Sequence, residues 1–137
     1  MLMRDVAKQR AFAVLYLSNE INDAVTLRSQ LRNHGFAANV LHATSFEEAL
    51  TQAGKNTLDV VLVDFGSHSG SVLDTMLEDN HRPVFDRLPK LVIADVDDDD
   101  QVLPLYELGA TAVVTHESRL IPVLVREVAA SMTEQER

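Results

Sequence analysis

Five short apolar runs recur along the chain, and stretches with helical spacing of apolar residues separate them. The runs occupy residues 11–17, 38–43, 58–65, 90–96 and 111–115. Strands that are apolar on both faces must be covered on both faces, so this alternation predicts parallel strands with helices on either side. With right-handed crossovers, the expected fold is α/β: a doubly wound, three-layer sandwich around a five-stranded parallel sheet.

The first two stretches between these runs carry clear helix boundary signals. Apolar residues follow helical spacing over 24–34, and Gly35 marks the end of that helix. Ser45 and Glu48 have the pattern of a capping box, in which each side chain binds the backbone N–H of the other residue. A second helix is therefore expected directly after Ser45.

The later helices have weaker signals. Residues 71–77 are expected to form a short helix, which the polar run at 79–82 ends. The acidic run at 97–100 suits a helix N-terminus, and Pro104 is then expected in the first turn of that helix. Ser118 is placed to cap a last helix, whose apolar face begins at Ile121.

Length, charge and cysteine content narrow the functional class. The 137 residues fit one domain, and we expect a leader over 1–10, the domain over 11–130 and a polar tail over 131–137 that leads toward an output domain. The net charge of -9 disfavours binding to nucleic acid or to anionic membranes. The chain has no cysteine, no apolar run of about 20 residues and no signal-peptide pattern, so we expect a cytoplasmic protein.

Two segments resemble a known family. Residues 58–65 (LDVVLVDF) form a strand that ends near Asp64, and residues 107–116 (ELGATAVVTH) lead from a helix into the last strand. In this order of elements, residues 11–130 resemble the CheY-like receiver domains of two-component response regulators, which have a flavodoxin-like fold. The resemblance implies a phosphoacceptor aspartate, an acidic pair for Mg²⁺, and a hydroxyl residue and a lysine that bind phosphoryl oxygens.

Only one of these positions carries the residue that the resemblance leads us to expect. Asp64 falls on the phosphoacceptor. Ser18 and Asn19 fall on the acidic pair, and Glu20 follows one place later. Mg²⁺ prefers hard anionic oxygen ligands, so the resemblance implies a weakened metal site.

The remaining positions of the pocket also depart from the family pattern. Ala94 falls on the hydroxyl residue, and Asp95 adds a negative charge beside it. His116 falls on the lysine, and Val113 falls where many receivers carry a switching aromatic residue. Removing one electrostatic partner typically costs about 2.7–4 kcal/mol of transition-state stabilisation, so a phosphoryl group here would be poorly neutralised.

The resemblance therefore implies an atypical receiver that is not an enzyme and needs no cofactor. Its expected output is binding to a protein partner or an output domain, or formation of a homodimer, with impaired or absent aspartyl phosphorylation. The family often uses the surface formed by the fourth helix, the fifth strand and the fifth helix. Tyr106, Leu120 and Ile121 are the expected members of that surface here.

Two alternatives remain open. In the first, the receiver is phosphorylated by a histidine kinase: Glu20 and Asp64 bind Mg²⁺, and His116 replaces the lysine. In the second, the carboxyl edge of the sheet senses a small molecule or a metal, with the acidic run 97–100 as a source of ligands. Neighbouring aspartates point in different directions, so a run alone is not a metal cage. The other histidines, at positions 34, 42, 68 and 81, show no metal-ligand spacing.

Overall fold

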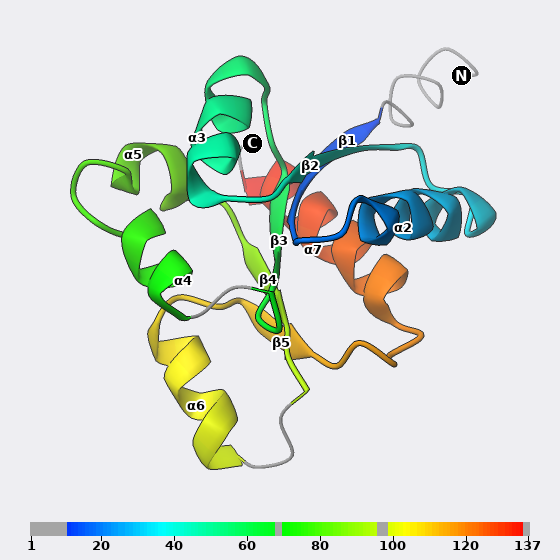
Figure 1. The fold of residues 1–137 in the computed structure, drawn as a ribbon. Helices are drawn as coiled ribbons and strands as arrows, with labels where there is room; N and C mark the ends of the chain where they lie inside the picture. Colours follow the sequence, from blue (N-terminus) through cyan, green and yellow to red (C-terminus); the bar gives the residue numbers. More distant parts are fainter. Residues whose placement is uncertain (1–10, 68–69, 96–98, 136–137) are drawn as a thin grey trace.

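The centre of the molecule is a five-stranded parallel sheet with the strand order β2-β1-β3-β4-β5 (Figure 1). The computed structural model describes residues 11–67, 70–95 and 99–135. The order reverses between β1 and β3, which is the switch point where doubly wound sheets form their binding crevices. This topology confirms the predicted α/β fold. The strands are β1 (Phe12–Leu17), β2 (Ala38–Ala43), β3 (Val60–Asp64), β4 (Lys90–Ile93) and β5 (Ala112–Val114).

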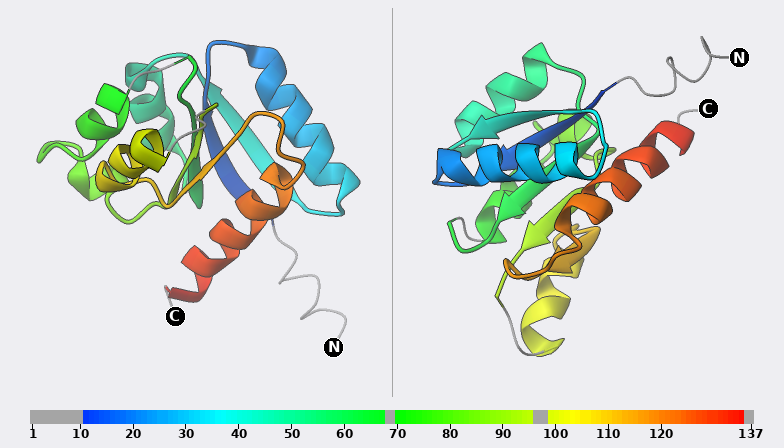
Figure 2. Two further views of the ribbon diagram at one scale, coloured as in Figure 1. Left: turned by 90° about the horizontal axis from the view of Figure 1, so that it is seen from below. Right: turned by 90° about the vertical axis from the view of Figure 1, so that its right-hand side faces the viewer.

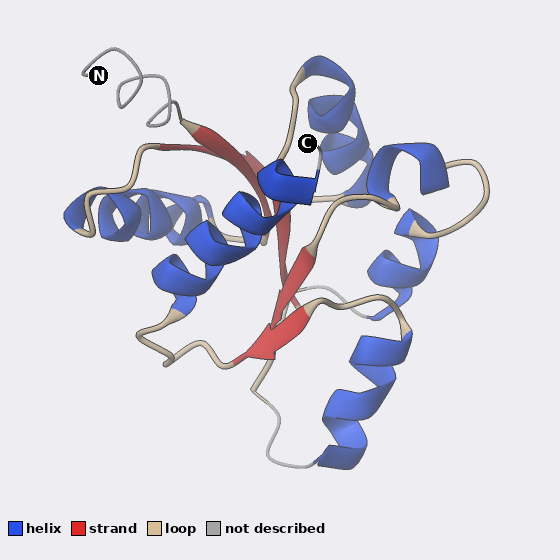
Figure 3. Cartoon of the chain, turned by 180° about the vertical axis from the view of Figure 1, so that it is seen from behind, coloured by secondary structure: helices blue, strands red, loops and turns tan. Residues whose placement is uncertain are grey.

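Helices cover both faces of the sheet and complete three layers (Figures 2 and 3). One face packs against α2 (Ile21–Asn33) and α7 (Ile121–Gln135). The other face packs against four shorter helices. No helix in the described ranges is long and apolar enough to cross a membrane. The four helices are α3 (Phe46–Lys55), α4 (Gly70–Met76), α5 (Arg82–Phe85) and α6 (Asp99–Glu107).

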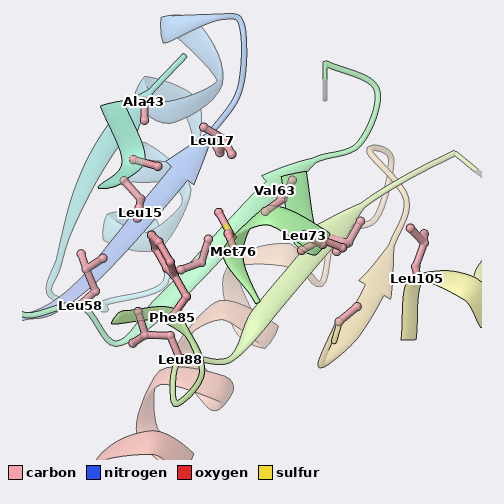
Figure 4. Close-up of a cluster of buried hydrophobic side chains, with 14 of the residues drawn as sticks. Leu15, Leu17, Ala43, Leu58, Val63, Leu73, Met76, Phe85, Leu88 and Leu105 are labelled. Atoms are coloured by element: carbon pink, nitrogen blue, oxygen red, sulfur yellow. The ribbon is translucent and has the colours of Figure 1, made fainter. Parts of the chain in front are cut away.

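Alternation of side chains along each strand explains why the strands are apolar throughout. In β1, Leu15 and Leu17 belong to the core under α3 to α6, which Figure 4 shows in close-up. Val14 and Tyr16 belong to the core under α2 and α7. Successive residues of a strand point to opposite faces, so both faces of a central strand must be apolar.

Two helices, α4 and α5, fill the segment between β3 and β4, where the sequence predicted only one. The segment near Arg82 was expected to end the first of these helices. Instead it starts α5, which has Pro83 in its first turn, where the missing N–H has no helical partner to lose. Phe85 of α5 is completely buried in the core, so packing stabilises a helix too short to be seen from periodicity.

Two helix-boundary predictions were partly wrong. Ser45 does cap α3, since its Oγ accepts a hydrogen bond from the Glu48 N–H at 3.2 Å. The Glu48 carboxylate, however, accepts from the N–H of Thr44 at 2.8 Å and not from that of Ser45. Ser118 accepts from the Leu120 N–H at 3.1 Å and so stabilises the turn before α7.

Pro104 was expected in the first turn of its helix, and this prediction is wrong. Helix α6 begins at Asp99, so Pro104 is inside it. The helix continues past the proline, and the N–H of Leu108 donates to the Pro104 carbonyl at 3.0 Å. Asp97 and Asp98 of the acidic run lie outside the described residues, as do His68 and the leader 1–10.

Candidate functional site at the carboxyl edge of the sheet

The loops after the parallel strands meet at one edge of the sheet and bring together three predicted residues. Asp64 is the last residue of β3, Asp95 follows β4, and His116 follows β5. Nε2 of His116 lies 3.0 Å from Oδ1 of Asp64, and its Nδ1 lies 3.0 Å from Oδ2 of Asp95. One imidazole therefore connects the ends of three strands.

The Asp64 carboxylate is buried and already has two partners. Its side chain is only 7% exposed. Besides the contact with His116, Oδ1 accepts a hydrogen bond from the Gly66 N–H at 2.9 Å. A Cβ at position 66 would lie 3.1 Å from that same oxygen, so glycine permits the close approach of the loop backbone to the carboxylate.

His116 is held by Asp95 through both its side chain and its backbone. The His116 N–H donates to Oδ1 of Asp95 at 3.1 Å, and this bond is the main cause that lowers the pKa of Asp95. Burial acts to lower the pKa of His116, but the hydrogen bonds and charges of Asp64 and Asp95 outweigh it and raise that pKa. Protonated histidine donates from both nitrogens, so the geometry favours an imidazolium between two carboxylates.

Ser18 is fully buried and serves the start of α2. Its Oγ accepts from the Glu20 N–H at 3.0 Å and donates to Oδ2 of Asp23 at 2.9 Å. Its carbonyl accepts from Nε2 of His42 at 2.8 Å. The hydroxyl that replaces the expected carboxylate is therefore engaged in capping the turn, and Asp23, which the sequence did not single out, is part of the site.

Asn19 and Glu20 do not form an acidic pair with Asp64. The Asn19 amide donates a long hydrogen bond of 3.4 Å to the Ser67 carbonyl, across to the loop after β3. Glu20 is exposed at the N-cap of α2, and its side chain makes no capping bond. These hydroxyl and amide donors do not fit the acidic pair that the family fold implies for Mg²⁺.

Tyr16 is a second residue of this site that sequence reasoning missed. It lies in the middle of an apolar strand, so its pattern indicates only a core residue. Burial is the main cause that raises the pKa of its phenol, and the charges of Asp23 and Asp64 raise it further. The phenol thus stays protonated beneath a negatively charged edge of the sheet.

The position expected to supply a switch hydroxyl is part of the core. Ala94 is 2% exposed and packs in the cluster under α3 to α6. Val113 is half-buried, and its N–H donates to the Tyr106 hydroxyl at 3.2 Å. Tyr106 therefore covers the outer edge of β5 from α6.

Two of the three residues expected on the interaction surface are exposed. Tyr106 and Leu120 are 43% and 60% exposed, and Leu103 of α6, which was not predicted, is 58% exposed. Ile121 was wrongly placed on this surface. It is 9% exposed and packs with Val125 against the sheet, because the first turn of α7 already faces the core.

Other candidate ligands are engaged elsewhere. His34 stacks on Phe36, and His81 packs edge-on against Phe46. Within the described ranges, no group of three or more histidine, aspartate or glutamate side chains is arranged to hold a metal ion. The acidic run lies partly outside those ranges, so it stays a prediction.

Comparison with solved structures supports the fold described above. A protein of Chloroflexus aurantiacus J-10-fl described as a candidate response regulator superposes with a TM-score of 0.71 at 24% identity, covering 88% of this chain and 99% of that one. A Thermotoga maritima response regulator gives 0.69 at 21% identity, covering 88% and 98%. The chain has the receiver-domain fold.

The same fold also occurs inside longer proteins. NtrX of Brucella abortus superposes with a TM-score of 0.70 at 17% identity over 93% of this chain, but over only 28% of its own. No protein-family model matches this sequence, and no curated protein matches it either. The receiver fold is therefore supported by structural similarity alone.

Proposed function

We propose that this receiver-fold domain acts in two-component signalling as a protein-interaction module whose aspartyl phosphorylation is impaired. The observation that carries the proposal is the position of His116 between Asp64 and Asp95. A carboxylate whose charge is balanced by His116, and whose Oδ1 also accepts from the Gly66 N–H, is a poor acceptor for a phosphoryl group. The output is then binding and not catalysis.

Electrostatics supports impaired phosphorylation. Phosphoryl transfer depends on positive groups that neutralise charge on the transferred oxygens. Here the cationic group that contacts Asp64 is shared with Asp95, whose own carboxylate lies at the other nitrogen of the ring. A phosphoryl group on Asp64 would break the contact with His116 and would meet Asp95 without a metal-binding acidic pair to offset it.

The same contacts support a role as a fixed scaffold. His116 joins the loop before α6 to the loop before α7. Leu103 and Tyr106 on α6 and Leu120 just before α7 are exposed large apolar side chains, and such side chains are candidates for contact with a protein partner. Because His116 holds the two loops together, it would limit the movement of these side chains relative to one another.

The active-receiver alternative has one observation in its favour. Nε2 of His116 already contacts Asp64 at 3.0 Å, which is where a receiver's lysine would be expected to act. Under this alternative, protonated His116 moves from the Asp64 carboxylate to the phosphoryl oxygens, and Glu20 contributes to Mg²⁺ binding. The experiment below separates the two proposals.

The test is phosphorylation by acetyl phosphate with Mg²⁺, followed by intact mass spectrometry. We expect the wild-type chain to gain little phosphate. We expect a variant that restores the family pattern (Ser18→Asp, Asn19→Asp, Ala94→Thr and His116→Lys) to gain at least about tenfold more, the effect of about 1.4 kcal/mol in the barrier. Adding Asp64→Asn to that variant should remove the gain. Wild-type phosphorylation that equals the restored variant would contradict the proposal.

A structural readout complements the mass measurement. We expect the amide NMR spectrum of the wild type to change little with Mg²⁺ and beryllofluoride, a phosphoryl mimic. Shifts that centre on Asp64 and extend to α6 and α7 would favour the active-receiver alternative. The restored variant serves as the positive control. Its spectrum before Mg²⁺ and beryllofluoride are added shows whether the substitutions preserve the fold.

A further inference from the structure

A cavity of about 670 Å³ lies at the opposite end of the sheet from Asp64. Its walls come from the start of β1, the helix α2, the strand β2 and the loop before β3. The lining is part polar and part apolar, and Arg28 and Arg32 are its charged members. Small-molecule sites commonly have a volume in this range and combine apolar surface with a few polar groups.

Among the described residues, neither of the two arginines has a carboxylate partner, and one of them, Arg28, is held in place by a backbone carbonyl. Nη2 of Arg28 donates to the Val40 carbonyl at 3.0 Å, which fixes the guanidinium. A guanidinium has five N–H donors, so four remain to bind a ligand. Arg32 follows one turn later on the same face of α2. In the part of the chain that the structure describes, neither forms an ion pair, although the chain has 21 acidic residues.

An anion would relieve the repulsion between these two arginines. Like charges at positions i and i+4 of a helix repel each other. The carboxylate of Asp59, which follows the lining residues Asn56 and Thr57 in the sequence, is already engaged, since its Oδ2 accepts from the Ala13 N–H at 2.8 Å. An anion in the cavity would instead sit against the guanidiniums of α2.

The ring of Phe36 supplies an apolar wall beside these charges. It stacks on His34, with 5.7 Å between ring centroids, and the guanidinium carbon of Arg126 lies 5.7 Å from its centroid. Arg126 itself is 3.5 Å from the Glu127 carboxylate, so its charge is balanced. These contacts orient the ring of Phe36.

We propose that this cavity binds a small organic anion. Its carboxylate or phosphoryl group lies on Arg28 and Arg32, and its apolar part lies against Phe36 and Ala38. Planar guanidiniums suit both groups because they can donate two parallel hydrogen bonds to either. The site does not depend on whether Asp64 is phosphorylated.

The test is an amide NMR titration of the full chain with phenyl phosphate, with inorganic phosphate and benzoate as the two partial probes. We expect saturable shifts at Arg28, Arg32 and Phe36, with phenyl phosphate bound at least about tenfold more tightly than inorganic phosphate. Saturation by benzoate at the same residues assigns the site to carboxylates as well. Sodium chloride at matched ionic strength should not reproduce the shifts.

Matched variants identify the residues responsible. Arg32→Gln leaves the Arg28 bond to Val40 intact and should weaken phenyl phosphate binding at least about tenfold. Arg87→Gln, an exposed arginine outside the cavity, should leave binding unchanged. Shifts that stay linear with concentration, that sodium chloride reproduces, or that survive Arg32→Gln would overturn the proposal.

Discussion

Nε2 of His116 lies 3.0 Å from Oδ1 of Asp64, although 52 positions separate the two residues in the chain. The resemblance to receivers leads us to expect a lysine at position 116, whose charge is permanent at physiological pH. An imidazole changes its charge between about pH 5 and 8. The connection between the ends of β3, β4 and β5 should therefore depend on pH.

The first prediction concerns stability against pH in wild type and His116→Gln. The folded state raises the pKa of His116, so the stabilisation from its charge is complete below the ordinary pKa of about 6.5 and is lost as pH rises through the folded value. We expect the wild type to exceed the variant by about 1 kcal/mol near pH 5.5 and by much less near pH 8.5. Urea unfolding at both values measures the difference.

Asp95 sets the lower limit of the pH range in which this stabilisation is present. Its pKa is lowered in the folded state, so its contribution is present above the ordinary carboxyl pKa and is lost as pH falls through the folded value. A stability difference between wild type and His116→Gln that is the same at pH 5.5 and pH 8.5 would show that the charge of His116 contributes nothing.

The second prediction concerns the separate effects of Asp64 and Asp95 on His116. Replacing either carboxylate with an amide removes a negative charge that raises the histidine pKa. We expect Asp64→Asn to lower the His116 pKa more than Asp95→Asn does, because Asp64 is buried and Asp95 is largely exposed to screening water. NMR titration of the imidazole Cε1–H signal gives both values. An unchanged pKa in Asp64→Asn would show that the contact does not persist in solution.

The pattern of apolar residues predicted the sheet because strands that are buried on both faces are continuous apolar runs in the sequence. Leu15 and Tyr16 face opposite layers, and a chain can satisfy both only with an apolar strand. The short helix α5 left no such mark. Its formation depends on burial of Phe85 in a core assembled from distant segments, and single-sequence patterns do not record that contact.

The site was predictable in part for a related reason. Parallel strands place their carboxyl ends together, so the topology alone brought Asp64, Asp95 and His116 to one edge. Their pairing through the two nitrogens of one ring depends on loop geometry and could not be foreseen. The role of Asp23 was missed because a charged residue in the first turn of a helix is ordinary.

The third prediction compares two glycines that both have positive φ. Gly35 has a φ of +80°, with no atom within 4 Å of an added Cβ, whereas Gly109 has a φ of +106° and its Cβ would lie 2.7 Å from Cδ1 of Leu77. We expect Gly35→Ala to cost about 1 kcal/mol from backbone strain alone. Gly109→Ala should cost about 1–3 kcal/mol more, because Leu77 must move. Thermal unfolding of both variants checks the order, which a larger loss for Gly35→Ala would contradict.

The fourth prediction concerns Lys90, a lysine buried to 3% exposure at the start of β4. Its Nζ donates to the carbonyls of Phe85 and Leu88, both at 2.7 Å, and so ties α5 to the strand. Lys90→Met keeps the aliphatic volume but leaves both buried carbonyls without this donor. We expect a loss of about 1–3 kcal/mol in the free energy of unfolding, measured with urea at pH 7.

An exposed lysine and a change of pH supply the controls for Lys90. Lys55→Met, at the end of α3, should stay within about 0.5 kcal/mol of the wild type. Burial lowers the pKa of Lys90, so the unfolded chain holds its proton more tightly than the folded one. The wild type should therefore gain stability relative to Lys90→Met as pH rises toward about 10. A Lys90→Met variant as stable as Lys55→Met would show that the cost of burying the ammonium cancels its two hydrogen bonds.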